Sequence, residues 1–225
     1  MKAALVKSEG ARTSRKKPPT KRTRGRPANN ASVGPDLILR VARQTFARRG
    51  FEATSVREIA RDCGVDPALI AHHFGSKGSL WTAVVQQIAE QALPLIEATA
   101  ALRTLPIGAT ARVERAVALL VDQVFAQPDI GMFFSTAATE EGECSDKLIE
   151  ELVRPYHDVL VPLLMDGENA GEVSVSNANL SFFMLVNAIS KTVSYGHVLA
   201  AFSSLVEHRK KYKRAVLVTA LKMLG

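Results

Sequence analysis

Apolar side chains recur at spacings of three and four along most of the chain. In the first such segment Ile38, Val41 and Phe46 fall on one face, which predicts an amphipathic helix that begins near Asp36. Gly50 is a natural C-terminal cap for that helix. No later segment shows the strict alternation of polar and apolar residues that marks a half-buried strand. The hydrophobic pattern therefore predicts an all-α protein.

The next segment predicts two short helices joined by a tight turn. Ser55 and Glu58 have the spacing of a capping box, in which the hydroxyl and the carboxylate each accept a hydrogen bond from a free backbone amide. A glycine then interrupts the pattern, and Asp66-Pro67 supplies an N-cap followed by a proline at the first helical position. Residues 55–74 therefore have the arrangement of a helix-turn-helix motif.

Further helices are predicted as far as the end of the sequence. A fourth helix restarts after Ser76, with an apolar stripe from Leu80 to Ile88, and is expected to end at about Pro94. The start and stop signals beyond it are Pro128, Ser145, Gly171 and Ser176, and the expected spans are 109–126, 128–140, 145–169, 176–203 and 207–224. The span 176–203 carries more large apolar residues than one buried face requires, which indicates a partner helix from another chain.

Composition is typical of a globular protein and excludes several classes. The 225 residues are 47% hydrophobic and 23% charged. We expect no membrane span, because no run approaches about 18 uncharged apolar residues. Cys63 and Cys144 lie far apart without a CxxC pair, so neither a disulfide scaffold nor a zinc knuckle has its ligands. They are expected to be reduced thiols of a cytoplasmic protein.

Positive charge is concentrated at the N-terminus. Residues 1–34 hold ten Lys and Arg against one acidic residue, whereas the remaining residues hold 19 basic and 21 acidic side chains. The basic segment lacks the apolar stretch of a secretion signal and has few large apolar side chains, so we expect residues 1–31 to be a disordered arm. A cationic arm on a nearly neutral body indicates a polyanionic partner, either nucleic acid or an anionic membrane surface. Nucleic acid is favoured, because the arm has no apolar face that would insert into a membrane.

Residues Phe46 to Leu80 closely resemble the TetR family of bacterial transcriptional regulators. The residues that carry the resemblance are Gly50-Phe51, Ser55, Ile59-Ala60, Gly64-Val65, His72-His73-Phe74 and Ser76-Lys77, in the family's order and spacing. The resemblance covers roughly residues 32–92 and implies an all-helical homodimer. It implies an N-terminal three-helix DNA-binding domain at 32–92, with the helix-turn-helix at 55–74, and a helical effector-binding and dimerisation domain at 93–225.

The resemblance also assigns DNA contacts to particular residues. It places the helix that begins at Asp66 in the major groove, with its first side chains at base edges, its histidine pair near phosphates and Lys77 as the best single phosphate contact. The family often has an aromatic residue where Ala71 stands, so a contact from that position is expected to be missing. The implied DNA-binding residues are Ser55, Arg57, Asp66, Pro67, Ala68, Ala71, His72, His73 and Lys77.

Simpler structural roles compete with some of these assignments. Ser55 and Asp66 cap helices whether or not DNA is bound. Val65, Ile70 and Phe74 are expected in the core of the small domain. The two adjacent histidines lack the third and fourth ligands that a metal site needs, so we predict no metal.

The arm carries a second, shorter motif. Its residues Arg22, Arg24, Gly25, Arg26 and Pro27 resemble the core of an AT-hook, which lies extended in a narrow A·T-rich minor groove. The alternative is a solvated cationic tail that attracts phosphates without regard to sequence.

No catalytic constellation assembles in the sequence, so we predict neither an enzyme nor a cofactor. The acidic run Glu140, Glu141, Glu143 beside Cys144 is interpreted as a solvated loop. Polar and aromatic groups in the later helices are candidates to line a pocket for a small effector, although core or interface packing is the alternative for each. These candidates are Phe133, Arg154, Tyr156, His157, Phe183, Tyr195 and His197.

The pattern and the resemblance together predict a DNA-binding regulator. We expect a homodimer on double-stranded DNA, with operator half-sites about 34 to 36 Å or a small multiple apart and the two spans 176–203 and 207–224 forming a four-helix dimer interface. The resemblance favours a ligand-responsive repressor. The alternative is an architectural protein that binds A·T-rich DNA through its basic arm.

Overall fold

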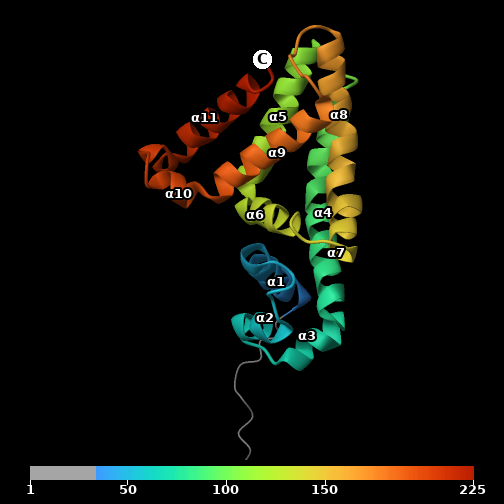
Figure 1. Ribbon diagram of the computed structural model, residues 1–225, viewed down its shortest axis with the longest axis vertical. Helices are drawn as coiled ribbons and strands as arrows, with labels where there is room; N and C mark the ends of the chain where they lie inside the picture. Colours follow the sequence, from blue (N-terminus) through green and yellow to red (C-terminus); the bar gives the residue numbers. More distant parts are fainter. Residues whose placement is uncertain (1–33) are drawn as a thin grey trace, which may run out of the picture. The chain divides into compact units, whose positions relative to one another are not determined.

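The computed structural model describes residues 34–225, and the basic arm expected over 1–31, with its AT-hook-like motif, lies outside them. The described part is helical and contains no strand, which confirms the predicted all-α class (Figure 1). Its elements are α1 (Pro35–Arg49), α2 (Val56–Cys63), α3 (Pro67–Phe74), α4 (Lys77–Leu102), α5 (Ala109–Ala126), α6 (Pro128–Ala137), α7 (Glu143–Leu148), the π-helical turn η1 (Ile149–Val153), α8 (Arg154–Asn169), α9 (Ala178–Ser194), α10 (Gly196–Ala200), the 3-10 turn η2 (Ser204–Glu207) and α11 (Arg209–Lys222).

The helix-turn-helix forms where the sequence predicts it. α1 ends at Gly50, which adopts a φ of 81° that disfavours residues with a Cβ. Ser55 caps α2 by accepting a hydrogen bond from the Glu58 amide at 3.2 Å, and Asp66 caps α3 by accepting from the Ala68 amide at 2.8 Å. α2 and α3 therefore begin at the predicted caps.

The capping box is only half formed. The Glu58 carboxylate does not bond back to the Ser55 amide as predicted, because it forms an ion pair with Arg49 at 3.0 Å and lies 3.8 Å from Arg61. This ion pair joins the start of α2 to the last turn of α1. The acid of the predicted box thus stabilises the packing of two helices.

The long C-terminal helices differ from the predicted spans. α5 has the predicted bounds, but α4 continues through Pro94 to Leu102, because helices packed along its length compensate the one backbone hydrogen bond that proline removes. The predicted helix 145–169 instead begins at Glu143 after a glycine, and η1 interrupts it. The predicted cap Ser145 is therefore inside a helix.

The predicted helix 176–203 is divided in two. Its cap is Asn177, not Ser176, with the Asn177 side chain accepting from the Leu180 amide at 2.9 Å. α9 ends at Tyr195, whose backbone leaves the helical region, and α10 begins at the next residue. The apolar stripe could not reveal this break, because it continues across it.

Two hydrophobic cores hold the described residues. The N-terminal core surrounds the helix-turn-helix with Phe46, Ile70 and Trp81, and it also includes Phe133 of α6 and Leu148 of α7. The C-terminal core packs side chains of α5, α8, α9 and α11. Of the three residues predicted for the small core, Ile70 is fully buried, whereas Val65 and Phe74 are half-buried against it.

No single helix of residues 34–225 is long and apolar enough to cross a membrane. α5 and α6, bent by 96° relative to each other, pass that test of length and composition only as a pair.

Candidate nucleic-acid interface

α3 presents most of the predicted base-reading and phosphate-binding residues to solvent. Pro67, Ala68, Ala71, His72 and His73 are all exposed, while the opposite face of the helix is held in the N-terminal core. The side chains at the start of α3 are small. Such a face allows the backbone of a helix to come close to base edges in a major groove.

The polar residues at the two helix starts differ in how they are engaged. Ser55 and Asp66 are exposed, and both side chains accept a hydrogen bond from their own helix. Arg57 is exposed and makes none of the side-chain hydrogen bonds or ion pairs found within residues 34–225. It is therefore a cation available to an anionic partner.

Lys77, at the first position of α4, has partners inside the protein. Its Nζ donates to the carbonyl oxygen of Phe51 at 3.0 Å and to that of Glu52 at 3.5 Å, and it lies 4.1 Å from the centroid of the Phe51 ring. Because an ammonium has three N–H donors, one is not used by these two carbonyls. The sequence indicated the lysine and not the partners that orient it.

The end of α6 contacts the same turn. Glu140 accepts a hydrogen bond from the Phe51 amide at 2.7 Å, so it is not the purely solvated charge that the sequence suggested. Thr136 donates to the Ala47 carbonyl at 2.7 Å. These partners lie 89 residues apart in the chain, and no local pattern identifies them.

The start of α6 is also tied to α1. The buried guanidinium of Arg43 lies 2.7 Å from the Asp129 carboxylate and donates to the Gln91 side chain at 3.0 Å. α6 is therefore attached to α1 at both of its ends, by Asp129 at the first turn and by Thr136 at the last.

A partly enclosed apolar cavity of about 90 Å³ lies behind α6, between α4, α5, α8 and α9. Two polar atoms of its lining, the Gln127 Oε1 and the Tyr156 hydroxyl, are buried without a hydrogen-bond partner in the described residues. Burial raises the pKa of Tyr156, while the neighbouring Thr99 hydroxyl acts in the opposite direction. The lining residues are Ile88, Ala92, Leu95, Leu120, Gln123, Val124, Gln127, Ile130, Gly131, Phe134, Leu152, Tyr156, Val186 and Ser190.

Tyr156 is the one member of the seven predicted pocket residues in this lining. Phe133 is buried in the N-terminal core, with its ring centroid 4.9 Å from that of Trp81. Arg154 is exposed and pairs with Glu150, and His157 bonds to Asp158 and Asn179. The remaining three, Phe183, Tyr195 and His197, are exposed on α9 and α10 and their junction.

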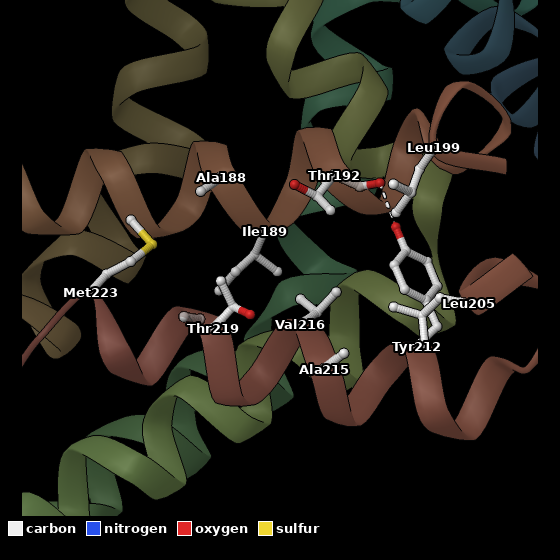
Figure 2. Close-up of a pocket in the computed structure, with 11 residues that line it drawn as sticks. Ala188, Ile189, Thr192, Leu199, Leu205, Tyr212, Ala215, Val216, Thr219 and Met223 are labelled. Atoms are coloured by element: carbon white, nitrogen blue, oxygen red, sulfur yellow. Dashed lines mark hydrogen bonds between the residues drawn. The ribbon is translucent and has the colours of Figure 1, made fainter. Parts of the chain in front are cut away.

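A second, more open apolar groove of about 180 Å³ runs between α9 and α11 (Figure 2). The Tyr212 side chain of α11 reaches α9, where its hydroxyl donates a hydrogen bond to the Thr192 carbonyl at 2.6 Å. Burial raises the pKa of the Tyr212 phenol. Large apolar side chains are exposed on the helices around it, namely Leu180, Phe183, Met184, Val198, Phe202, Val218 and Met223.

The cysteines and the other metal-binding side chains form no reactive centre in the part of the chain that is described. Burial and the carboxylate of Asp62 raise the pKa of Cys63, and burial and Glu140 raise that of Cys144. Both thiols are therefore poorly ionised. Among residues 34–225, no three His, Cys, Asp or Glu side chains lie together as a metal site would require.

Comparison with known proteins gives a family match at the same helices. The model for bacterial regulatory proteins of the tetR family matches residues 38–84. The transcriptional regulator UidR of Escherichia coli K12 is 39% identical over 56 residues, which are 25% of this chain and 29% of UidR. The repressor BdcR of the same strain is 32% identical over 77 residues, which are 34% of this chain and 38% of BdcR. The chain thus matches about a third of these relatives' length.

The fold extends beyond the matched helices. The structure of the transcriptional regulator FadR from Bacillus subtilis in complex with stearoyl-CoA aligns with 85% of this chain and 100% of FadR, with a TM-score of 0.60 and 17% identity. At this identity the similarity shows a shared fold.

Proposed function

We propose that this chain, which belongs to the TetR family of bacterial regulatory proteins, binds a pseudo-palindromic operator as a homodimer and regulates transcription as a ligand-responsive repressor. The observation that carries the proposal is α3, a capped helix with one face buried and a row of small and imidazole side chains exposed. A protein of this kind acts in the cytoplasm, where the bacterial chromosome lies.

In the proposed complex α3 lies in the major groove. Pro67 and Ala68 approach base edges through apolar contacts, and His72 and His73 lie near phosphates. Asp66 holds the start of the helix, and Ala71 leaves the position of a larger contact empty. Ser55, Arg57 and Lys77 bind the backbone on either side. Two copies of α3 in a dimer then read half-sites about 34 to 36 Å apart or a small multiple of that distance.

The second copy is proposed to pack on α9 and α11. Leu180, Phe183 and Met184 of α9 are about half exposed, as is Val218 of α11. Surface of this kind on two neighbouring helices fits a four-helix interface across a two-fold axis. Light scattering tests this: we expect twice the 24.3 kDa of one chain, a monomeric mass for Met184→Glu, and no change for Gln86→Glu on the exposed face of α4. A wild-type monomer at micromolar concentration would exclude the interface.

The cavity behind α6 is the proposed effector site. Its wall carries no charged side chain, so a neutral ligand is favoured. The Gln127 Oε1 can accept a hydrogen bond from such a ligand, and the Tyr156 hydroxyl can donate or accept one. FadR was solved with a long acyl-CoA, but a cavity of about 90 Å³ suits a compact ring and not a chain of that length. A ligand that displaces α6 changes the contacts of Asp129 and Thr136 with α1, and operator affinity then falls by the difference in ligand affinity between the two states.

Thermal shift with phenol and benzoate tests the proposed ligand class. Phenol carries a ring and one neutral donor, so we expect it to raise the melting temperature, whereas benzoate, which would bury a charge, leaves it unchanged. Gln127→Leu is expected to remove the phenol effect because it removes an acceptor, and Gln86→Leu, on the exposed face of α4, should retain it. An equal response to both compounds would contradict a neutral site.

Selection of fragmented genomic DNA by the full-length protein tests the DNA-binding function. An inverted repeat shared by the retained fragments supports a specific regulator. Broad recovery of A·T-rich DNA without a repeat supports the architectural alternative, in which Arg22, Arg24, Gly25, Arg26 and Pro27 dominate binding through the minor groove. Deletion of residues 2–30 separates the roles, since an arm that binds DNA adds affinity and steepens the salt dependence.

A further inference from the structure

One residue, Phe51, connects the segment between α6 and α7 to the start of α4. Its amide donates to Glu140 at 2.7 Å, and its carbonyl oxygen accepts from Lys77 at 3.0 Å. The Lys77 ammonium also lies over its ring, 4.1 Å from the centroid. Glu140, Phe51 and Lys77 therefore form a continuous chain of contacts. It runs from the segment after α6 to the lysine that is proposed to bind a phosphate.

Packing keeps Phe51 from moving independently of its neighbours. Its ring meets that of Trp81 edge to face, with centroids 5.4 Å apart, and that of Phe46 at 6.0 Å. At the preceding position a Cβ on Gly50 would lie 2.7 Å from the Glu140 Oε1. Glu140 is thus fitted closely against the turn that carries Phe51.

We propose that Glu140 is a positioning residue for the contact between Lys77 and a DNA phosphate, and this inference rests on the proposed DNA-binding function. The carbonyls of Phe51 and Glu52, at 3.0 and 3.5 Å, and the Phe51 ring together orient the ammonium, which leaves one N–H that neither carbonyl uses. Glu140 holds those carbonyls in place through the Phe51 amide. Without this hydrogen bond the Lys77 side chain is less well oriented in the free protein. Part of the binding free energy of the phosphate contact is then spent on ordering that side chain.

The sign of the effect distinguishes this role from simple charge repulsion. Glu140 is an acid near the proposed DNA-binding surface, so removing its charge alone should strengthen binding to a polyanion. Positioning predicts the reverse for Glu140→Ala, which removes the acceptor. Glu140→Gln removes the charge but keeps a side-chain oxygen, and Glu140→Asp keeps the charge but withdraws the acceptor by one methylene.

The experiment measures binding of a short mixed-sequence duplex by fluorescence anisotropy over a series of salt concentrations, with the full-length protein. We expect Glu140→Ala and Glu140→Asp to weaken binding about three- to tenfold, and Glu140→Gln to bind at least as tightly as wild type. The salt slope should fall for the two weakened variants, by at most about 1.8 per dimer, the value for two lost phosphate contacts. The control is Glu141→Ala, since Glu141 makes no side-chain hydrogen bond or ion pair in the described residues, and it should bind as wild type or more tightly.

A double variant makes the test specific to Lys77. In a Lys77→Met background, adding Glu140→Ala should not weaken binding or lower the salt slope, because the contact that Glu140 positions is already absent and only the loss of a negative charge remains. Circular dichroism and melting curves establish that each variant is folded. Wild-type affinity in both Glu140→Ala and Glu140→Asp, or an undiminished effect in the Lys77→Met background, would overturn the inference and leave the DNA-binding function intact. A wild-type protein that binds no duplex at low salt would instead refute the proposed function.

Discussion

The ion pair between Arg43 and Asp129 should be markedly asymmetric when each partner is removed. The Arg43 side chain is 9% exposed and that of Asp129 is 31% exposed. Asp129→Ala leaves a guanidinium buried with only Gln91 as a side-chain partner, whereas Arg43→Met leaves a carboxylate that water can reach. Breaking a fully buried pair costs about 3–5 kcal/mol. Because Asp129 is partly solvated, we expect about 2–3 kcal/mol for Asp129→Ala and about 1 kcal/mol for Arg43→Met.

Melting curves at one fixed protein concentration measure the asymmetry. For a chain of this size about 1 kcal/mol corresponds to about 2–4 °C, so Asp129→Ala should lower the melting temperature by about 4–12 °C and Arg43→Met by about half of that or less. The double variant should resemble Arg43→Met, since the uncompensated charge is then absent. If Asp129→Ala were no more destabilising than Arg43→Met, burial of the guanidinium would not govern the energy of this contact.

Three further predictions concern stability and are measured by unfolding. Glu172 accepts hydrogen bonds from the Thr110 amide and hydroxyl, which lower the pKa of its carboxyl group. Glu172→Gln should therefore destabilise the protein at neutral pH, and the difference in stability from wild type should disappear below about pH 4, where the carboxylate is protonated. A difference that persists in acid would contradict this. Gly167→Ala should cost about 1–3 kcal/mol because its Cβ would lie 2.7 Å from Val173. Gly78→Ala should be neutral or stabilising, because Gly78 lies in a helix and its Cβ would meet only the Ser76 Oγ, at 3.8 Å. Ser55→Ala should cost about 1 kcal/mol through the lost cap.

Local signals in the sequence were sufficient to predict the helix-turn-helix. The caps Ser55 and Asp66 and the stop at Gly50 act within four residues, so they could be interpreted without knowledge of the fold. The predicted end of α4 at about Pro94 is wrong for the opposite reason. Pro94 is a local signal to stop, and the packing of distant helices outweighs it.

The contacts that link α6 and the segment after it to the helix-turn-helix region could not be predicted in this way. Lys77 donates to a carbonyl 26 residues away, and Glu140 accepts from an amide 89 residues away. Taken alone, the lysine predicts a phosphate contact and the glutamate predicts a solvated charge. The cavity presents the same difficulty, because a helical stripe does not show which buried side chains pack and which face a void. Of the seven pocket residues that the sequence predicts, Tyr156 lies in the wall of the cavity behind α6. Gln127 also lies in that wall, and it is not among the residues that the sequence predicts.

Phe133 has a consequence for how proteins of this architecture can be recombined. Its ring belongs to α6 but lies in the N-terminal core beside Trp81, so the core around the helix-turn-helix includes a side chain from about fifty residues further along the chain. A chimaera joined within α4 near residue 92 would replace Phe133 with the residue that the other protein has at that position of its own α6. Exchange of the C-terminal segment for that of another protein is therefore constrained by the packing around Phe133, and a graft that carries α6 along with the first four helices keeps the N-terminal core whole.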